Sequence, residues 1–457
     1  MPNTDVDVVV VGAGIAGLCC AAHLLEQGVS TTLVCETPEV GWALRSAQLG
    51  KSSKGFVQHP IYAPGLNGGS WFSAARIVNA PVSFHISPPM HILNKATGAR
   101  AELKACPSAS SVLNALAPLV PFPIDAQRPD LERVLNICLR MSWDELAELQ
   151  RTPLAAWVGE QGGDEILTMI MCVLAANLAE TTPQIAAEHV SVYGMMGMLR
   201  GLVCGEAVVT APSPDPWEGL CVPLGKGLEA NGVEVRRGAK VAKVIVEDGR
   251  AVGVALQNGD EIRARAVALA VGNPRVPALL ETIPDEVSGA LDYAAQLLGH
   301  DACTYSLLDK DVVPIRNMTM VADEMGSNLA YLFPMNYIAP DSTEDGKWLL
   351  AAQAQFSKEA YQEIGGNEGA IKHLLAVQEE MFPGFEDATV ERKTMTHKHH
   401  WLNPLTHGPK LPGQSSDIPG LYFAGDGSTP IMGIGVEGAG QAGAIRARQI
   451  AADLRAS

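Results

Sequence analysis

The chain has 457 residues, which favours two domains over one simple core, and its 47% hydrophobic and 18% charged residues are typical of a folded protein. The formal net charge of −17 argues against nucleic-acid binding, because phosphates would be repelled, and against broad adsorption on anionic lipid. No apolar run approaches the roughly 18 residues that a membrane helix needs, so we expect no transmembrane segment.

The cysteines and histidines indicate neither a disulfide framework nor a metal site. Nine cysteines are present without a C-x-x-C pair, and the adjacent Cys19 and Cys20 are expected to be small buried residues. Reduced thiols favour a cytoplasmic location, and the acidic flank of Asp5 and Asp7 argues against a signal sequence. The histidines just before residue 401 alternate with polar residues, as on a strand or loop face, so we predict no metal.

Residues 8–11 are four valines, a run typical of a strand that is buried on both faces of a parallel sheet. A G-x-G-x-x-G pattern follows directly. Gly12 would allow a tight turn into a helix, Gly14 would let the backbone approach a pyrophosphate, and Gly17 would let the helix lie close to the strand. The contacts that we predict with a dinucleotide are Gly12, Ala13, Gly14, Ala16 and Gly17.

The same unit continues through a predicted helix over 18–25 and a second strand over 31–35 to an acidic residue. Gly28 supplies the stop between the two elements. Glu36, 24 positions beyond Gly12, can accept hydrogen bonds from ribose hydroxyls, and its charge disfavours the extra phosphate of NADP. The sequence therefore predicts a site for a dinucleotide.

The glycine pattern alone is weak, because residues 433–438 and 438–443 match it as well. Neither match follows a valine-rich strand, and too few residues remain for a strand–helix–strand unit. We interpret both as false matches. The strand, helix and acid around Gly12 carry the prediction.

Between Glu36 and about residue 75 the chain is rich in Gly, Ser and Lys and is predicted to form loops. Arg45 is a candidate for contact with the pyrophosphate, since a guanidinium suits bidentate phosphate binding. The alternative, which we weigh equally, is that Arg45 lies on the protein surface and contacts no cofactor.

From about 108 to 205 the apolar spacing is helical, over 130–148 and 165–180 in particular. The region is rich in methionine, which adapts to irregular apolar shapes. Its side chains could line a hydrophobic substrate pocket. An ordinary helical core is the interpretation that we favour.

Over 222–273 the pattern changes to short strands with Gly-containing turns, ending in a buried strand over 266–271, and 286–400 returns to mixed strands and helices. We predict an α/β fold in which a Rossmann-like cofactor domain is interleaved with an α+β substrate domain. The cofactor domain would comprise residues 1–75, 215–285 and 415–457. The substrate domain would comprise 76–214 and 286–414.

The fingerprint, the 232–273 block and the GLYFAGD stretch at 420–426 together resemble the phytoene desaturase and flavin amine oxidase superfamily. The resemblance covers the cofactor domain and implies FAD bound in an elongated form, with the flavin between the two domains. It implies that Gly12, Gly14 and Gly17 contact the pyrophosphate and that Glu36 binds the adenosine ribose.

The resemblance also assigns residues further along the chain. Val241 would meet the adenine through its backbone, and Gly425 and Asp426 would hold the ribityl or pyrophosphate region. Gly435 and Val436 would lie beside the flavin pyrimidine ring. A long helix is predicted over 436–454, and its N-terminus, with partial positive charge, would stabilise the anion of the reduced flavin.

Three features depart from the family pattern. Gly41-Trp42 stands where paired glycines are usual, and Arg45 is displaced. Residues 220–232 look too short for the usual helix before Val233. The tail over 428–433 is similar to the ketosteroid dehydrogenase group instead.

Flavin in such a site implies transfer of a hydride from carbon. We expect dehydrogenation of a small apolar substrate, alicyclic or isoprenoid, with oxidation of an amine and a redox-neutral isomerisation as alternatives. A protein that kept the fold and lost the chemistry is the non-enzymatic alternative. A homodimer is the one assembly that we consider.

A base and an acid that polarises oxygen would be needed for dehydrogenation next to a carbonyl. The candidates are histidines and tyrosines in the second half of the chain, and we rank His399 and His400 first, with Trp401 beside them. Tyr305 is also predicted as a catalytic residue. The wider set of candidates adds three residues: His397, Tyr331 and Tyr337.

Overall fold

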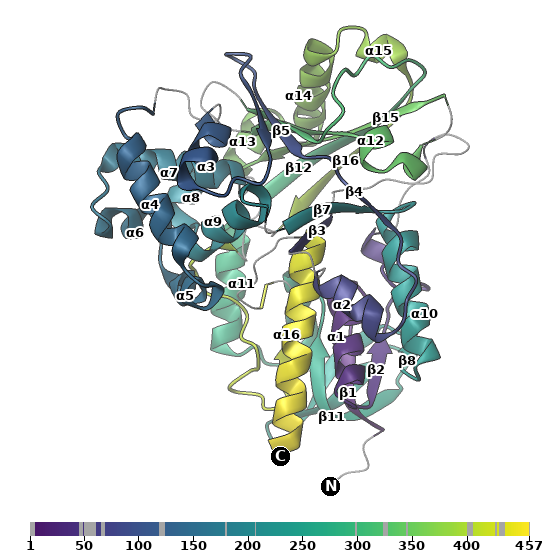
Figure 1. The fold of residues 1–457 in the computed structure, drawn as a ribbon. Coiled ribbons are helices and arrows are strands. Elements are labelled where there is room, and N and C mark those ends of the chain that lie inside the picture. The colour runs from purple at the N-terminus through teal and green to yellow at the C-terminus, as the bar shows by residue number, and fades with distance from the viewer. Residues whose placement is uncertain are drawn as a thin grey trace.

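A computed structural model describes most of the chain: residues 5–44, 49, 61–64, 69–117, 124–178, 181–205, 207–297, 299–322, 328–343, 346–399, 405–425, 427–428 and 435–456. Two large sheets dominate these residues, one at each end of the molecule, and both termini of the drawn chain lie at the end of the first sheet (Figure 1). The predicted mixed α/β fold is confirmed.

The first sheet has seven strands in the order β8-β2-β1-β11-β10-β9, with β17 paired to β11. The strands are β1 Val6–Val11, β2 Thr31–Val34, β8 Glu234–Arg236, β9 Val241–Glu247, β10 Arg250–Leu256, β11 Glu261–Leu269 and β17 Leu421–Phe423. The strands β8, β2, β1, β11 and β17 run parallel, whereas β9 and β10 are antiparallel additions. The sheet thus joins strands from the beginning, middle and end of the chain.

Helices cover one face of this sheet. They are α1 Ile15–Glu26, α2 Ser70–Ile77, α10 Val222–Ala230 and the long α16 Gly435–Ala456. A Cβ on Gly443 would lie 2.1 Å from the carbonyl oxygen of Ala16, and one on Gly440 would lie 3.4 Å from Cys19 Sγ. The glycines of the false match near residue 440 therefore let α16 pack closely against α1. Cys19 and Cys20 are fully buried, as predicted.

The second sheet also has seven strands, in the order β16-β12-β15-β14-β13-β5-β6. They are β5 Met90–Asn94, β6 Arg100–Leu103, β12 Gly299–Leu308, β13 Thr319–Ala322, β14 Asn328–Pro334, β15 Trp348–Phe356 and β16 Thr389–His399. Helix α14 (Gly366–Met381) covers one face through Leu374 and Val377. The other face joins the largest hydrophobic core of the molecule. A small third sheet contains β3 Ile61–Pro64, β4 Phe84–Ile86 and β7 Ala207–Pro212.

A group of helices lies beside the second sheet (Figure 1). They are α3 Ala109–Leu116, α4 Arg128–Arg140, α5 Trp143–Glu148, α6 Leu154–Glu160, α7 Glu165–Leu178, α8 Pro183–His189 and α9 Val192–Met198. Met171, Met195 and Met196 are fully buried in the large core, so the core interpretation of the methionine-rich region is confirmed for them. Met169 is the exception, because 46% of it is exposed.

The remaining helices are α11 Asp285–Gln296, α12 Met335–Ile338, α13 Lys358–Glu363 and α15 Phe385–Ala388. No helix in the described part of the chain is long and apolar enough to cross a bilayer. The 436–454 helix prediction is confirmed, since α16 contains it entirely.

Two local predictions are wrong. The 37–75 segment is not all loop, because β3 and the start of α2 fall within it. Trp71 in α2 is buried against α1, so tertiary packing stabilises a helix that the polar composition before it concealed. The 220–232 segment is not too short for a helix, because α10 lies within it. Pro223 stands in the first turn of this nine-residue helix.

Candidate cofactor and active site

The carboxyl ends of three parallel strands meet where the glycine fingerprint begins. Val11 of β1 lies beside Leu269 of β11, which in turn lies beside Phe423 of β17. The loops after these strands carry Gly12, Asn273 and Gly425. In open parallel sheets ligands bind at this edge, so the topology brings the two distant glycine motifs to one place.

Two of the three fingerprint glycines are required by close backbone contacts, and the third borders open space. Gly12 has φ of +103°, and a Cβ there would lie 2.5 Å from the oxygen of Ala270. A Cβ on Gly17 would lie 1.8 Å from the oxygen of Gly12, so only glycine lets α1 sit this close to the turn. A Cβ on Gly14 would meet nothing within 4 Å, which leaves open space at the helix start.

The N-terminus of α1 is suited to an anion. Gly14 is the N-cap residue and offers no side-chain cap, and no acidic residue stands in the first turn. The first N–H groups of a helix have no acceptor within the helix, and the helix dipole adds positive potential there. A phosphate group fits this environment without any rearrangement of side chains.

Asn273 lies at the same edge and was missed by the sequence analysis. It is 7% exposed, and its Oδ1 atom is buried without a hydrogen-bond partner among the described residues. A Cβ on Gly427 would lie 2.3 Å from this oxygen, so the glycine permits their close approach. A buried amide oxygen without a partner, beside the predicted nucleotide motif, fits a donor group of a bound cofactor. The sequence signal that could have identified Asn273 was the polar Gly272-Asn273-Pro274 turn directly after a buried strand.

The residues predicted to bind the adenosine end of the cofactor also lie close together. The backbone N–H of Ala239 donates to Cys35 at 2.9 Å, which lays the start of β9, with Val241, beside Glu36. Glu36 itself forms ion pairs with Arg275 at 2.8 Å and with Lys240 at 3.1 Å. All three side chains are partly exposed, so these pairs orient the carboxylate more than they stabilise the fold.

Glu437, near the start of α16, is a second residue that the sequence analysis missed. It is 1% exposed, and its Oε1 accepts from the backbone N–H of Ser70 at 2.9 Å and from Gln441 at 3.1 Å. Its Oε2 has no hydrogen-bond partner among the described residues. Burial raises the pKa of this carboxyl to about 7. The side chain ties the N-terminus of α2 to the helix that carries Gly435 and Val436.

Several predicted site residues lie outside the described residues: Arg45, Asp426, His400 and Trp401. The backbone of His399 ends β16 and pairs with Gly299 of β12. Gly425, the residue before Asp426, is described and lies close to the oxygen of Val271, which a Cβ would approach to 2.9 Å.

Tyr305 belongs to a buried polar row on the inner face of the second sheet. Asp301, Cys303 and Tyr305 alternate along β12, and each is 3% exposed or less. His397 of β16 stands opposite Asp301 in register, and its Nε2 lies 2.9 Å from Asp301 Oδ2. Asp301 was missed, because a single acidic residue in a strand of mixed polar and apolar residues does not by itself indicate a site.

Burial governs the chemistry of this row. Desolvation, with the neighbouring Cys303 and Asp301, raises the pKa of Tyr305 well above its ordinary value. Desolvation also raises the pKa of the Cys303 thiol. Tyr305 is therefore a protonated hydrogen-bond donor near neutral pH. The adjacent His397 and Asp301 form the pair that can handle a proton.

The other tyrosine candidates differ from each other. Tyr331 is 3% exposed and lies in the same core as Tyr305, stacked on Phe333 with ring centroids 6.5 Å apart. Tyr337 is 37% exposed and packs under the guanidinium of Arg316. The structure thus groups Tyr305, His397 and Tyr331 on one sheet.

Comparison with known families identifies the chain. Residues 160–451 match the family described as flavin containing amine oxidoreductase, and residues 7–152 match FAD dependent oxidoreductase. The chain belongs to the flavin containing amine oxidoreductase family. It is an FAD-dependent oxidoreductase, as the resemblance implied.

Curated relatives of this oxidoreductase include plant isomerases. It is 26% identical over 281 residues to a chloroplastic prolycopene isomerase of Daucus carota, a match that covers 52% of this chain and 43% of the relative. Prolycopene isomerase 2 of an Oncidium hybrid cultivar is 26% identical over 274 residues, covering 52% and 45%. The matches thus span less than half the length of these relatives.

Solved structures share the fold of the oxidoreductase over nearly its whole length. An oxidoreductase from Methanosarcina mazei has a TM-score of 0.68 at 19% identity and covers 97% of this chain and 100% of its own. Cyclohexylamine oxidase from Brevibacterium oxydans has a TM-score of 0.62 at 16% identity and covers 99% and 100%. At these identities the likeness shows the fold alone.

Proposed function

We propose that this oxidoreductase dehydrogenates a small apolar substrate, an alicyclic ketone or an isoprenoid. FAD, when bound, accepts the hydride that leaves a substrate carbon. The observation that carries the proposal is the inner face of the second sheet, where an apolar surface meets the polar row of Asp301, Cys303 and Tyr305. We also propose that the two sheets mark the two interleaved domains, with the boundaries stated for the sequence.

The FAD site that we propose contains the residues that the fold gathers at the carboxyl edge of the first sheet. The N–H groups at the start of α1 would hold the pyrophosphate, and Glu36 would accept from the ribose. Ala13 and Ala16 flank the same turn, and Val241 lies beside Glu36. Further proposed contacts are Arg45, Gly425, Asp426, Gly435 and Val436, to which the structure adds Asn273.

Tyr305 in the buried row and the neighbouring His397 have complementary properties for such a reaction. Tyr305, held protonated, can donate to a substrate oxygen and polarise it. His397 Nε2 lies 2.9 Å from Asp301 Oδ2, and this imidazole would take a proton from carbon. Asp301 would orient this imidazole. His399, His400 and Trp401 follow on the same strand and chain segment and stay candidates for the same surface.

Oxidation of an amine is the second candidate, supported by the family match over residues 160–451 and by the buried Tyr331–Phe333 stack. An amine site would be expected to place aromatic side chains around the flavin. Tyr422 is not one of them, because its hydroxyl donates to Asp453 at 2.8 Å. Asp453 lies about 27 Å along α16 from Gly435, the end proposed to face the flavin. A redox-neutral isomerisation is the third candidate, which the prolycopene isomerase relatives support.

A panel of substrates separates these reactions. The FAD-loaded protein is mixed without oxygen with cyclic ketones, linear polyenes and primary amines, and the yellow flavin absorbance is followed. We expect bleaching by a member of the ketone or polyene classes, with a desaturated product. Bleaching by amines alone would contradict the proposal, as would conversion of a cis polyene without any net bleaching. Tyr305→Phe should slow bleaching by a ketone at least tenfold while leaving FAD content unchanged.

The ribose assignment has its own test. Replacing Glu36 with alanine removes the acceptor for the ribose hydroxyls, and we expect FAD to dissociate roughly tenfold more readily, measured by release of flavin fluorescence during dilution. Arg275→Gln is the matched control, because it breaks the ion pair and keeps the carboxylate. Equal losses in both variants, or none in Glu36→Ala, would contradict the ribose role.

A further inference from the structure

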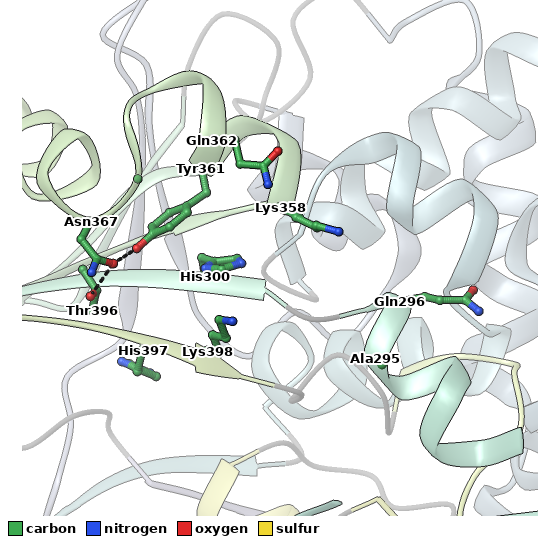
Figure 2. Close-up of a pocket in the computed structure, with 11 residues that line it drawn as sticks. Ala295, Gln296, His300, Lys358, Tyr361, Gln362, Asn367, Thr396, His397 and Lys398 are labelled. Carbon is green, nitrogen blue, oxygen red and sulfur yellow. Dashed lines mark hydrogen bonds between the residues drawn. The ribbon is translucent and has the colours of Figure 1, made fainter. Parts of the chain in front are cut away.

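A cleft of about 880 Å³ opens at the end of the second sheet, away from the glycine fingerprint. Its wall is formed by the ends of β12 and β16, by α13, by the start of α14 and by the end of α11 (Figure 2). His397 borders this cleft as well as the buried row, since its ring also reaches Asp301. The cleft therefore adjoins the inner face of the sheet without being part of the nucleotide edge.

The charge of the cleft is opposite to that of the whole protein. Two lysines and two histidines line it, Lys358, Lys398, His300 and His397, and no Asp or Glu is among its described lining residues. The chain as a whole carries a net charge of −17. Neither lysine forms an ion pair with another residue in the part of the chain that the structure describes. Two unneutralised ammonium groups at one concave site attract an anion.

The cleft also offers a flat ring surface and a directed amide. The rings of His300 and Tyr361 stack with centroids 4.2 Å apart and planes 23° from parallel. Asn367 Oδ1 accepts from the hydroxyl of Tyr361 and, at 2.9 Å, from Thr396 Oγ1 (Figure 2). Because its oxygen accepts both bonds, the Asn367 Nδ2 group is left as a hydrogen-bond donor to a ligand.

We propose that this cleft binds a small organic anion, whose carboxylate or phosphate is attracted by Lys358 and Lys398, with the Asn367 amide as a further donor on the cleft wall. The planar part of the ligand packs on the exposed side of the His300–Tyr361 stack. These three polar groups stand outside the proposed catalytic set, whereas His397, which belongs to that set, borders the same cleft.

Calorimetric titration of the FAD-loaded protein tests the proposal with benzoate, phenyl phosphate, inorganic phosphate and the uncharged benzamide. We expect saturable binding of benzoate or phenyl phosphate at one site, weaker binding of inorganic phosphate and no binding of benzamide. A preference for benzoate assigns the natural head group to a carboxylate, and a preference for phenyl phosphate assigns it to a phosphate. Because His397 borders the cleft, any flavin spectral shift that accompanies binding should be lost together with binding in the cleft-lysine variants described next.

Variants locate the binding site. The double variant Lys358→Gln, Lys398→Gln should weaken anion binding roughly tenfold or more. Lys310→Gln, Lys372→Gln is the matched control, because both lysines are exposed, neither lines the cleft and the change in net charge is equal. Absence of anion binding, equal affinity in the two double variants, equally tight benzamide binding, or a flavin spectral shift that persists in Lys358→Gln, Lys398→Gln would each overturn the proposal.

Discussion

Replacing Gly17 with alanine is expected to abolish retention of FAD and to lower the free energy of unfolding by about 2–4 kcal/mol. The added Cβ would lie 1.8 Å from the carbonyl oxygen of Gly12, which is backbone and cannot rotate away. Helix α1 must then move off the turn, and its first N–H groups leave the place where a phosphate would be held. Flavin content after purification and urea unfolding of the protein measure the two effects.

A second glycine on a helix provides the control for this substitution. Gly289 in α11 is exposed, and a Cβ there would meet nothing within 4 Å. Gly289→Ala should retain FAD fully and raise stability by about 0.5–1 kcal/mol, because alanine is the better helix former. Full FAD occupancy in Gly17→Ala would show that the close approach of α1 to the turn is not needed for binding.

Replacing Glu437 with glutamine is expected to remove much of the fall in stability between pH 5 and pH 8. Burial raises the pKa of this carboxyl in the folded protein to about 7, above its ordinary value of 4.5. The folded protein therefore holds the proton more tightly than the unfolded chain does. The stabilisation is complete below about pH 4.5 and is lost as the pH rises through about 7.

The magnitude follows from the size of this shift. Between pH 5 and pH 8 the wild-type protein should lose about 2–3 kcal/mol more than Glu437→Gln, as measured by urea unfolding with FAD in excess. Glu363→Gln, at an exposed position on α13, should keep the wild-type slope. If the slope is the same in wild type and Glu437→Gln, the buried carboxyl does not titrate in this range.

Patterns within short segments of the sequence were sufficient to predict the nucleotide-binding unit. The valine run, the spacing of Gly12, Gly14 and Gly17, and the position of Glu36 all reflect contacts between neighbouring turns of one strand–helix–strand unit. The long final helix was predicted in a similar way, because the frequent Ala and Arg that favour it lie within one segment.

Contacts between distant segments could not be predicted in this way. The carboxylate of Glu437 meets the backbone of Ser70 because the fold packs α16 against α2, and Asp301 meets His397 because it pairs β12 with β16. The partners of Glu36 show the same limit, because Arg275 and Lys240 come from loops and strands far along the chain. The residue types were visible in the sequence, whereas their pairing was not.

The close packing of α16 on α1 has a consequence for how the protein is made. Ala16 and Gly443 touch through backbone atoms, and β17 adds to the same sheet beside β11. During synthesis, the first helix and strand emerge from the ribosome long before the elements that cover them. We therefore expect the apolar surface of the nucleotide-binding core to stay exposed until residues near 440 are available, which places its folding late in synthesis.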